Sequence, residues 1–438
     1  MQRASLSSVW PVALLCLLAF AGESGLARHW AGLGLFSQYN VIFDTDPNNS
    51  AGAIAHAWAT FTFNHPLLNA LTGLPLKALS KALAAAGLVA NDEAWRQSTL
   101  PWLLGAFAAA RALFFFLSFR ILDLSVWQAS AATLIGSLSF APVVFGAVPD
   151  SYALSATLMA LILWLALRLA SGAARWLARG WWLAGLCAVG VTVSNVIHVG
   201  WFGLCWQHLR GLRLRPAFLR SVASGAVLLV VACGLGYAIA GATGTLTPRP
   251  DHDPVSHQAG FFQRHFATPE RALENIARFP ERLARGVVPT MPLFRPDTLA
   301  SLSGPIPIMA TYNGLPFTPA AALLWLGGLT VCGLGATIAW RRGGQWRVFG
   351  MGALASLLSY ALLFSAFGTN TFLYSVYWHT PAMVLVAACL ASPWSESWPG
   401  RIALGAVILG LAAGDWAVLA GMAGELAAYS PPARPLTP

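Results

Sequence analysis

The sequence predicts an all-α, polytopic membrane protein. Of its 438 residues, 57% are hydrophobic and only 10% are charged, and the mean hydropathy is +0.63. Soluble domains contain about 25% charged residues, so this composition excludes a chain of ordinary soluble domains. The apolar residues also gather into runs of about 20, which is the length that a helix needs to cross the hydrocarbon core of a bilayer.

Nine apolar runs are long enough to cross the membrane. The predicted crossings are residues 9–26, 100–122, 126–148, 151–170, 221–240, 319–340, 348–367, 372–391 and 402–423. Each is expected to be a helix, because a helix satisfies its backbone polar groups within its own segment. Arg3 precedes the first run and no clear small-residue cleavage site follows it, so we expect an uncleaved anchor.

Residues 181–208 are predicted to form a short helical hairpin. This stretch is either one long span or two half-length helices broken at Ser194–Asn195. Arginines lie on both sides of it, at positions 168, 175 and 179 and at positions 210, 213, 215 and 220. A single crossing would leave one cluster outside, against the positive-inside rule. A hairpin keeps both clusters in the cytoplasm and puts the N-terminus inside and the C-terminus outside.

Two long loops then fall on the outer face, residues 27–99 and 241–318. They hold ten of the sixteen carboxylates, and loops of this length are usually functional. We therefore expect an extracytoplasmic active site, and the arginine-, alanine- and glycine-rich composition favours a bacterial inner membrane. The predicted divisions are a membrane module at 1–240, the second outer loop at 241–318, transmembrane helices at 319–430 and a disordered tail at 431–438.

Several classes of function are excluded. The net charge of +10 comes mostly from arginines in short loops, where they set topology, so nucleic-acid binding is not expected. The six cysteines lie in apolar runs without a CxxC pair, which argues against disulfides and thiolate metal sites. No Walker loop, GxSxG or HExxH motif occurs, which excludes ATP-driven pumping and zinc proteolysis by known motifs.

The first outer loop carries the principal acidic candidates. Asp44 and Asp46 lie just before Pro47, and a close carboxylate pair suits a general base because neighbouring negative charges favour proton uptake. The alternative is a hydrated turn that caps a helix starting near Pro47. Asp150, at the outer turn between two spans, is either the N-cap of the returning helix or part of the same site, together with His65. Whether Asp46 and Asp150 share a divalent cation such as Mg²⁺ or Mn²⁺ stays open.

Three further candidates lie in or beside the predicted spans. Arg111 lies midway along its span, where a charge costs about 2.5–3.5 kcal/mol to insert, so it must face an anion. Either Asp415 in the last span or a substrate is expected to supply that anion. Tyr374 and His379 begin a span at the outer face, where they contribute either to the site or to an interfacial aromatic belt.

The second outer loop is cationic. Its His257 and Arg264 are predicted to bind phosphate, and a polyprenyl-phosphate headgroup is the phosphate expected at this depth. Part of the charge has a second explanation in helical ion pairs. The loop contains two i,i+4 glutamate–arginine pairs, Glu274 with Arg278 and Glu281 with Arg285.

Together these features resemble the GT-C class of multi-spanning glycosyltransferases, such as protein O-mannosyltransferases and aminoarabinose transferases. The resemblance covers residues 9–240. It rests on the acidic first outer loop, the His65–Pro66 element after it, Asp150 at an outer turn and the short hairpin. Many members have a basic residue before Pro-Pro, whereas Asn64–His65 precedes a single proline here.

The resemblance implies that the protein transfers a sugar, with inversion, from a polyprenyl-phosphate donor to an extracytoplasmic hydroxyl. Asp46, or Asp44, looks like the catalytic base, Asp150 like the second acidic residue, and His65 like part of the loop that shapes the site. Loop arginines or a divalent cation would stabilise the departing lipid phosphate.

Two other classes of function remain as alternatives. A transporter or flippase for amphiphiles would use Arg111 and Asp415 to line a path, although the inverted hydropathy repeats of many transporters are not found. A non-catalytic scaffold is expected if the carboxylates prove to be scattered.

Overall fold

The protein is helical over most of the residues that the structure describes. The computed structural model describes residues 6–37, 43, 45, 64–172, 176–243, 266–295, 309–312, 315–366 and 371–429. The elements are α1 Leu6–Gly32, η1 Leu35–Ser37, α3 Leu68–Ala85, α4 Asp92–Ile121, α5 Val126–Ser137, α6 Phe140–Gly146, α7 Ser151–Ala170, α8 Trp176–Val191, η2 Val193–Asn195, α9 Val196–Leu209, α10 Leu214–Ala242, α12 Pro269–Ala277, α13 Phe279–Arg285, β1 Leu293–Arg295, β2 Met309–Thr311, α14 Pro319–Arg342, α15 Gly344–Ala366, η4 Thr371–Tyr374, α16 Ser375–Leu390, α17 Pro393–Glu396 and α18 Trp398–Tyr429. The all-α membrane class is therefore as predicted, apart from the short antiparallel pair β1–β2.

Seven of the described helices are long and apolar enough to cross a membrane: α1, α4, α7, α10, α14, α15 and α18. Helices α5 and α6 add an eighth crossing if they count as one span bent by 57°. The predicted count of nine is not confirmed, because the run 372–391 yields the 16-residue helix α16. Since α16 is buried among α7, α14 and α15, its apolar sequence reflects contact with protein rather than with lipid.

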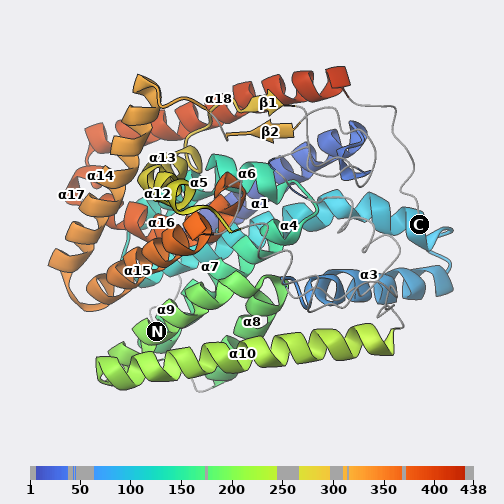
Figure 1. Ribbon diagram of the computed structural model, residues 1–438, viewed down its shortest axis with the longest axis horizontal. Coiled ribbons are helices and arrows are strands. Elements are labelled where there is room, and N and C mark those ends of the chain that lie inside the picture. The colour runs from blue at the N-terminus through green and yellow to red at the C-terminus, as the bar shows by residue number, and fades with distance from the viewer. Residues whose placement is uncertain are drawn as a thin grey trace.

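The bundle is built around α4 and α7. Helix α4 packs against both α1 and α7, and α10 and α18 lie at opposite edges of the molecule (Figure 1). Both edge helices expose large apolar side chains, such as Val230, which is 73% exposed, and Trp416, which is 78% exposed. Exposed apolar surface of this extent is the face that a membrane protein presents to lipid.

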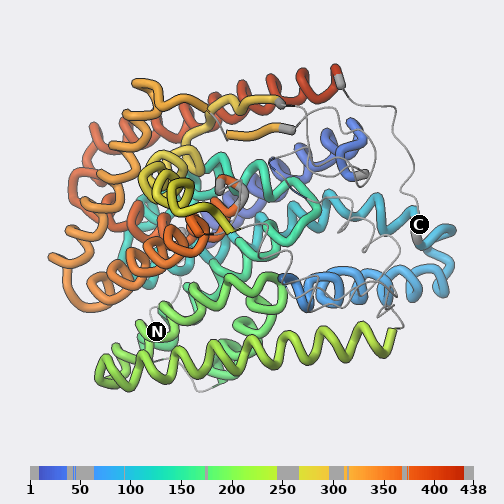
Figure 2. The backbone as a smooth tube through the Cα atoms, in the orientation of Figure 1, coloured from blue at the N-terminus to red at the C-terminus, as the bar shows by residue number. Residues whose placement is uncertain are grey.

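The predicted hairpin is confirmed as two half-length helices. Helices α8 and α9 are separated by the single turn η2, and both pack against α10 (Figure 2). The helix breaks where Thr192 adopts an extended backbone, with φ of −154°. Asn195 Nδ2 donates to the carbonyl of Ala188 over 2.8 Å and so satisfies a backbone group near the break.

The bend between α5 and α6 is stabilised by the segment that follows α13, which belongs to the predicted second outer loop. The backbone N–H groups of Phe140 and Ala141 donate to the carbonyls of Val287 and Gly286 over 3.2 and 2.9 Å. A helix broken inside a membrane needs such partners for its freed backbone groups. The second loop therefore reaches into the bundle rather than lying over it.

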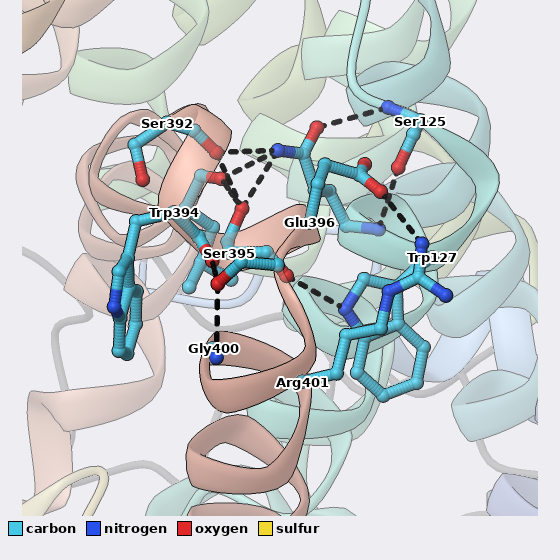
Figure 3. A network of polar contacts seen from close by, with 11 residues as sticks. Ser125, Trp127, Ser392, Trp394, Ser395, Glu396, Gly400 and Arg401 are labelled. Atoms are coloured by element: carbon cyan, nitrogen blue, oxygen red, sulfur yellow. Dashed lines mark hydrogen bonds and ion pairs between the residues drawn. The ribbon is translucent and has the colours of Figure 1, made fainter.

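A polar network ties the connection between α16 and α18 to the start of α5 (Figure 3). Ser395 accepts a hydrogen bond from Gln128 Nε2 at Oγ, over 2.7 Å, and one from Trp127 Nε1 at its carbonyl, over 3.2 Å. Arg401 forms an ion pair with Glu396 over 3.1 Å. These contacts fix the position of the last span against the centre of the bundle.

Replacing Gly335 with alanine should destabilise the bundle. A Cβ at this position would lie 2.6 Å from the carbonyl oxygen of Leu385 in α16, and overpacking of this kind costs about 1–3 kcal/mol. Gly333, on the same helix α14, has no neighbour within 4 Å of such a Cβ and is the matched control. We expect the thermal unfolding midpoint in detergent to fall for Gly335→Ala and not to fall for Gly333→Ala. Equal midpoints for the two variants would contradict the packing of α14 on α16.

Candidate functional site

Four of the predicted site residues lie outside the described residues: Asp44, Asp46, His257 and Arg264. The structure describes the two residues that flank Asp44 in the sequence. Phe43 and Thr45 are both fully buried. They are the described residues nearest in sequence to the predicted base, so their surroundings define the candidate site.

The ring of Phe43 lies at the centre of an aromatic cluster. Its centroid is 4.7 Å from that of Phe372, 5.1 Å from that of Tyr312 and 5.8 Å from that of Phe145. Its backbone N–H donates to the carbonyl of Ala310 in β2 over 3.0 Å. We call the following five residues the Phe43 cluster: Phe43, Phe140, Phe145, Tyr312 and Phe372. The cluster joins the predicted first outer loop (27–99), helix α6, the predicted second outer loop (241–318) and η4.

Asp150 lies at the end of α7 that contacts this cluster. Its carboxylate accepts a hydrogen bond from the backbone N–H of Ser151, so the predicted N-cap role is confirmed. Two residues further along, the ring of Tyr152 lies 5.2 Å from that of Phe145 and 5.7 Å from that of Tyr377. The N-terminus of α7 is thus held between the Phe43 cluster and α16.

The His65 element is bound to the tip of the α8–α9 hairpin. Leu67 N–H donates to the carbonyl of Gly190 over 2.7 Å, and His65 Nδ1 lies 3.2 Å from Thr192 Oγ1. Tyr377 OH donates to the same Thr192 oxygen over 3.4 Å. The hydroxyl of Thr192 therefore links His65 to Tyr377. The ring of Tyr377 in turn contacts Tyr152, which lies two residues after Asp150.

The same network continues into the helix bundle. Ser155 Oγ lies 3.3 Å from Thr192 Oγ1, and Asn195 Nδ2 donates to Ser155 Oγ over 3.1 Å. All three side chains are buried, so their hydrogen bonds offset the cost of removing them from water. The network couples the break in the hairpin to the start of α7.

Tyr374 and His379 are placed in different surroundings. The ring of Tyr374 stacks on that of Phe364 with centroids 4.1 Å apart, at the junction of η4 with α15. His379 is 3% exposed and lies against Phe115 of α4, with ring centroids 5.7 Å apart. Tyr374 therefore lies near Tyr377, whereas His379 lies in the interior of the bundle.

The anion that faces Arg111 is Glu23. The two side chains form an ion pair between α4 and α1, with 1% and 5% of their side-chain surfaces exposed. Glu23 also packs directly on Gly146 of α6, where a Cβ would leave no room for its carboxylate. The expected need for an anion is confirmed, but Asp415 does not supply it. Glu23 is the single carboxylate of the first apolar run, and this feature of the sequence could have identified it.

Asp415 instead lies near the Phe43 cluster. It is 4% exposed, and neither of its carboxylate oxygens has a hydrogen-bond partner among the described residues. Burial raises the pKa of the neighbouring Tyr312 phenol, and the charge of Asp415 raises it further, against the opposing effects of Thr290 and Arg285. Arg285 lies over the Tyr312 ring, 5.0 Å from its centroid.

The predicted ion pairs of the second loop are confirmed. Glu274 pairs with Arg278 over 3.9 Å, and Glu281 pairs with Arg285 over 2.8 Å. Glu281 also binds Arg278 over 2.9 Å. Burial alone would raise the pKa of Glu281, but the two arginines outweigh it and hold that pKa below its ordinary value. Both arginines therefore have a carboxylate partner, and they share Glu281.

Arg282 differs from these neighbours. Its Nη1 donates to the amide oxygen of Asn275 over 2.9 Å, and no carboxylate of the described residues lies within 4 Å of it. Burial and, next, the charge of Arg278 lower its pKa to about 10, against the opposing charges of Glu281 and Glu274. It stays cationic at neutral pH, so it can bind an anion. The spacing of the sequence could have identified it, because Arg278 and Arg285 each follow a glutamate by four residues, whereas Arg282 does not.

The described residues contain no group of three or more His, Cys, Asp or Glu side chains that could hold a metal ion. A cation shared by Asp46 and Asp150 stays a prediction, since Asp46 lies outside the described ranges.

The sequence matches no known protein-family model and no curated protein. The geometry of the site is therefore the principal basis for a functional proposal.

Removing one partner of the Glu23–Arg111 pair should destabilise the protein strongly. Arg111→Met leaves an uncompensated buried carboxylate, which costs about 3–5 kcal/mol. The double variant Glu23→Leu/Arg111→Met removes both charges and should recover most of the loss. Thermal unfolding of the purified variants measures this, and a double variant no more stable than Arg111→Met would show that the pair does not act as a unit.

Proposed function

We propose that the protein transfers a sugar from a polyprenyl-phosphate donor to a hydroxyl acceptor at the outer face of the membrane. One observation supports this most directly. The Phe43 cluster gathers, around a single point, the residue before Asp44, the end of α7 that carries Asp150, and the arginine-bearing second loop. A base, a second acidic group and cations are the parts that this reaction needs.

The base acts on the acceptor. Asp46, or Asp44, takes the proton of the acceptor hydroxyl while the hydroxyl oxygen attacks the anomeric carbon of the donor sugar. The bond between that carbon and the phosphate oxygen breaks, and the polyprenyl phosphate departs with the bonding electrons. Because attack occurs opposite the leaving group, the configuration at the anomeric carbon inverts.

The second outer loop stabilises the departing phosphate. Arg282 has no carboxylate of the described residues within 4 Å, and it is partly buried. A guanidinium held in advance at this position favours the charge that develops on the phosphate. His257 and Arg264 belong to the same loop and are proposed to contact the same phosphate.

Transport is the weaker proposal. A path between Arg111 and Asp415 would require both side chains to be available to an amphiphile in transit. Arg111 is instead 1% exposed and paired with Glu23. The buried pair ties α1 to α4, which suits a structural role.

Asp46→Asn should lower the rate of transfer about 10²- to 10⁴-fold while donor binding is retained, because the general base is lost. The assay is release of polyprenyl phosphate by the reconstituted protein, with Asp44→Asn tested beside it to decide which carboxylate acts. Asp123→Asn is the matched control, since Asp123 has φ of 58° and asparagine tolerates that conformation. Full transfer activity in both Asp44→Asn and Asp46→Asn would exclude the first loop as the source of the base.

Arg282→Gln should raise the KM for the donor about 10- to 100-fold, because a hydrogen bond to a charged group contributes about 1.5–3 kcal/mol. Arg271→Gln, at an exposed position of α12, is the control and should leave the KM unchanged. Equal KM values for the two variants would remove Arg282 from the phosphate site.

A further inference from the structure

An apolar groove runs between α9 and α10, and no residue of the Phe43 cluster lines it. Its volume is about 360 Å³. Its principal lining residues are Val196, Gly200 and Trp201 of α9 and Phe218, Val222 and Leu229 of α10. The outer side of α10 beside it is apolar and exposed, so the groove opens toward lipid.

The length of the groove matches one leaflet of a bilayer. Eleven residues separate Phe218 from Leu229, which is about 16 Å along a helix. The hydrocarbon core of a bilayer is about 30 Å thick, so the groove covers about half of it. An acyl chain of one leaflet fits this length, whereas a long polyprenyl chain would extend beyond it.

The arginine-rich end of α10 supplies charge at the mouth of the groove. Arg215 lies three residues before Phe218 and seven before Val222, so the helical repeat puts all three on one face. Arg215 is exposed, and the sequence holds no carboxylate between Asp150 and Asp251 to neutralise it. The positive-inside rule assigns this end to the cytoplasm. Basic sites of this kind beside membrane helices bind anionic headgroups.

We propose that this groove binds an anionic phospholipid of the cytoplasmic leaflet, with one acyl chain between α9 and α10 and the phosphate on Arg215. The bound lipid fills the space that the small residues Gly200 and Ala226 leave open between the two helices. It would seal the interface between α9 and α10 against the surrounding bilayer.

Lipid binding to the full-length protein in detergent tests this, with native mass spectrometry as the readout and phosphatidylglycerol as the probe. Gly200→Leu puts an apolar side chain into the groove, and no atom lies within 4 Å of a Cβ built there. Gly234→Leu is the matched control, since Gly234 also has open space and lies further along α10. Arg215→Gln tests the headgroup contact, and Arg220→Gln, on the opposite face of α10, is its control.

We expect Gly200→Leu to lose the bound phosphatidylglycerol and Arg215→Gln to weaken its binding about tenfold, with both controls unchanged. Zwitterionic phosphatidylcholine should bind the wild-type protein about tenfold more weakly. Unchanged binding in Gly200→Leu would overturn the groove as the site. Displacement of phosphatidylglycerol by an equimolar polyprenyl phosphate would overturn the assignment to a phospholipid.

Discussion

Burial of the Phe43 ring is the contact on which the candidate site depends. Phe43 has φ of 51°, and a left-handed backbone at such a residue costs about 1–3 kcal/mol. The surrounding rings of the Phe43 cluster offset this cost, since each buried aromatic ring removes about 150–250 Å² from water. Because those rings come from α6, η4 and the second loop, one side chain determines where four segments meet.

Polar groups inside the bundle impose a second constraint. Glu23 and Arg111 must face each other, and Thr192 must face both His65 and Tyr377, so the rotations of α1, α4 and α16 about their axes are restricted. Asp415 is the exception, because its oxygens have no hydrogen-bond partner among the described residues. A buried carboxylate without a partner is costly, and its position near Tyr312 favours a role at the site rather than in the packing.

Local features of the sequence predicted local structure well, and long-range partners were not predictable. The Asp150 cap, the i,i+4 pairs of α12 and α13 and the split hairpin follow from neighbours in the chain or from charge topology. The run 372–391 is not confirmed as a crossing, because it yields a 16-residue buried helix and hydropathy does not distinguish burial in protein from burial in lipid. The bend after α5 depends on Val287, and the Phe43 cluster on Tyr312, and no local signal specifies such distant contacts.

Photo-crosslinking tests most directly whether a lipid phosphate binds beside the Phe43 cluster. The full-length protein would be reconstituted with polyprenyl phosphate that carries a photoreactive group next to the phosphate, and labelled peptides would be identified by mass spectrometry. We expect labels in the peptides that contain Tyr312, Phe372 or Arg282, reduced by an excess of unlabelled polyprenyl phosphate. Labels confined to α9 and α10, with none in these peptides, would contradict the proposed site.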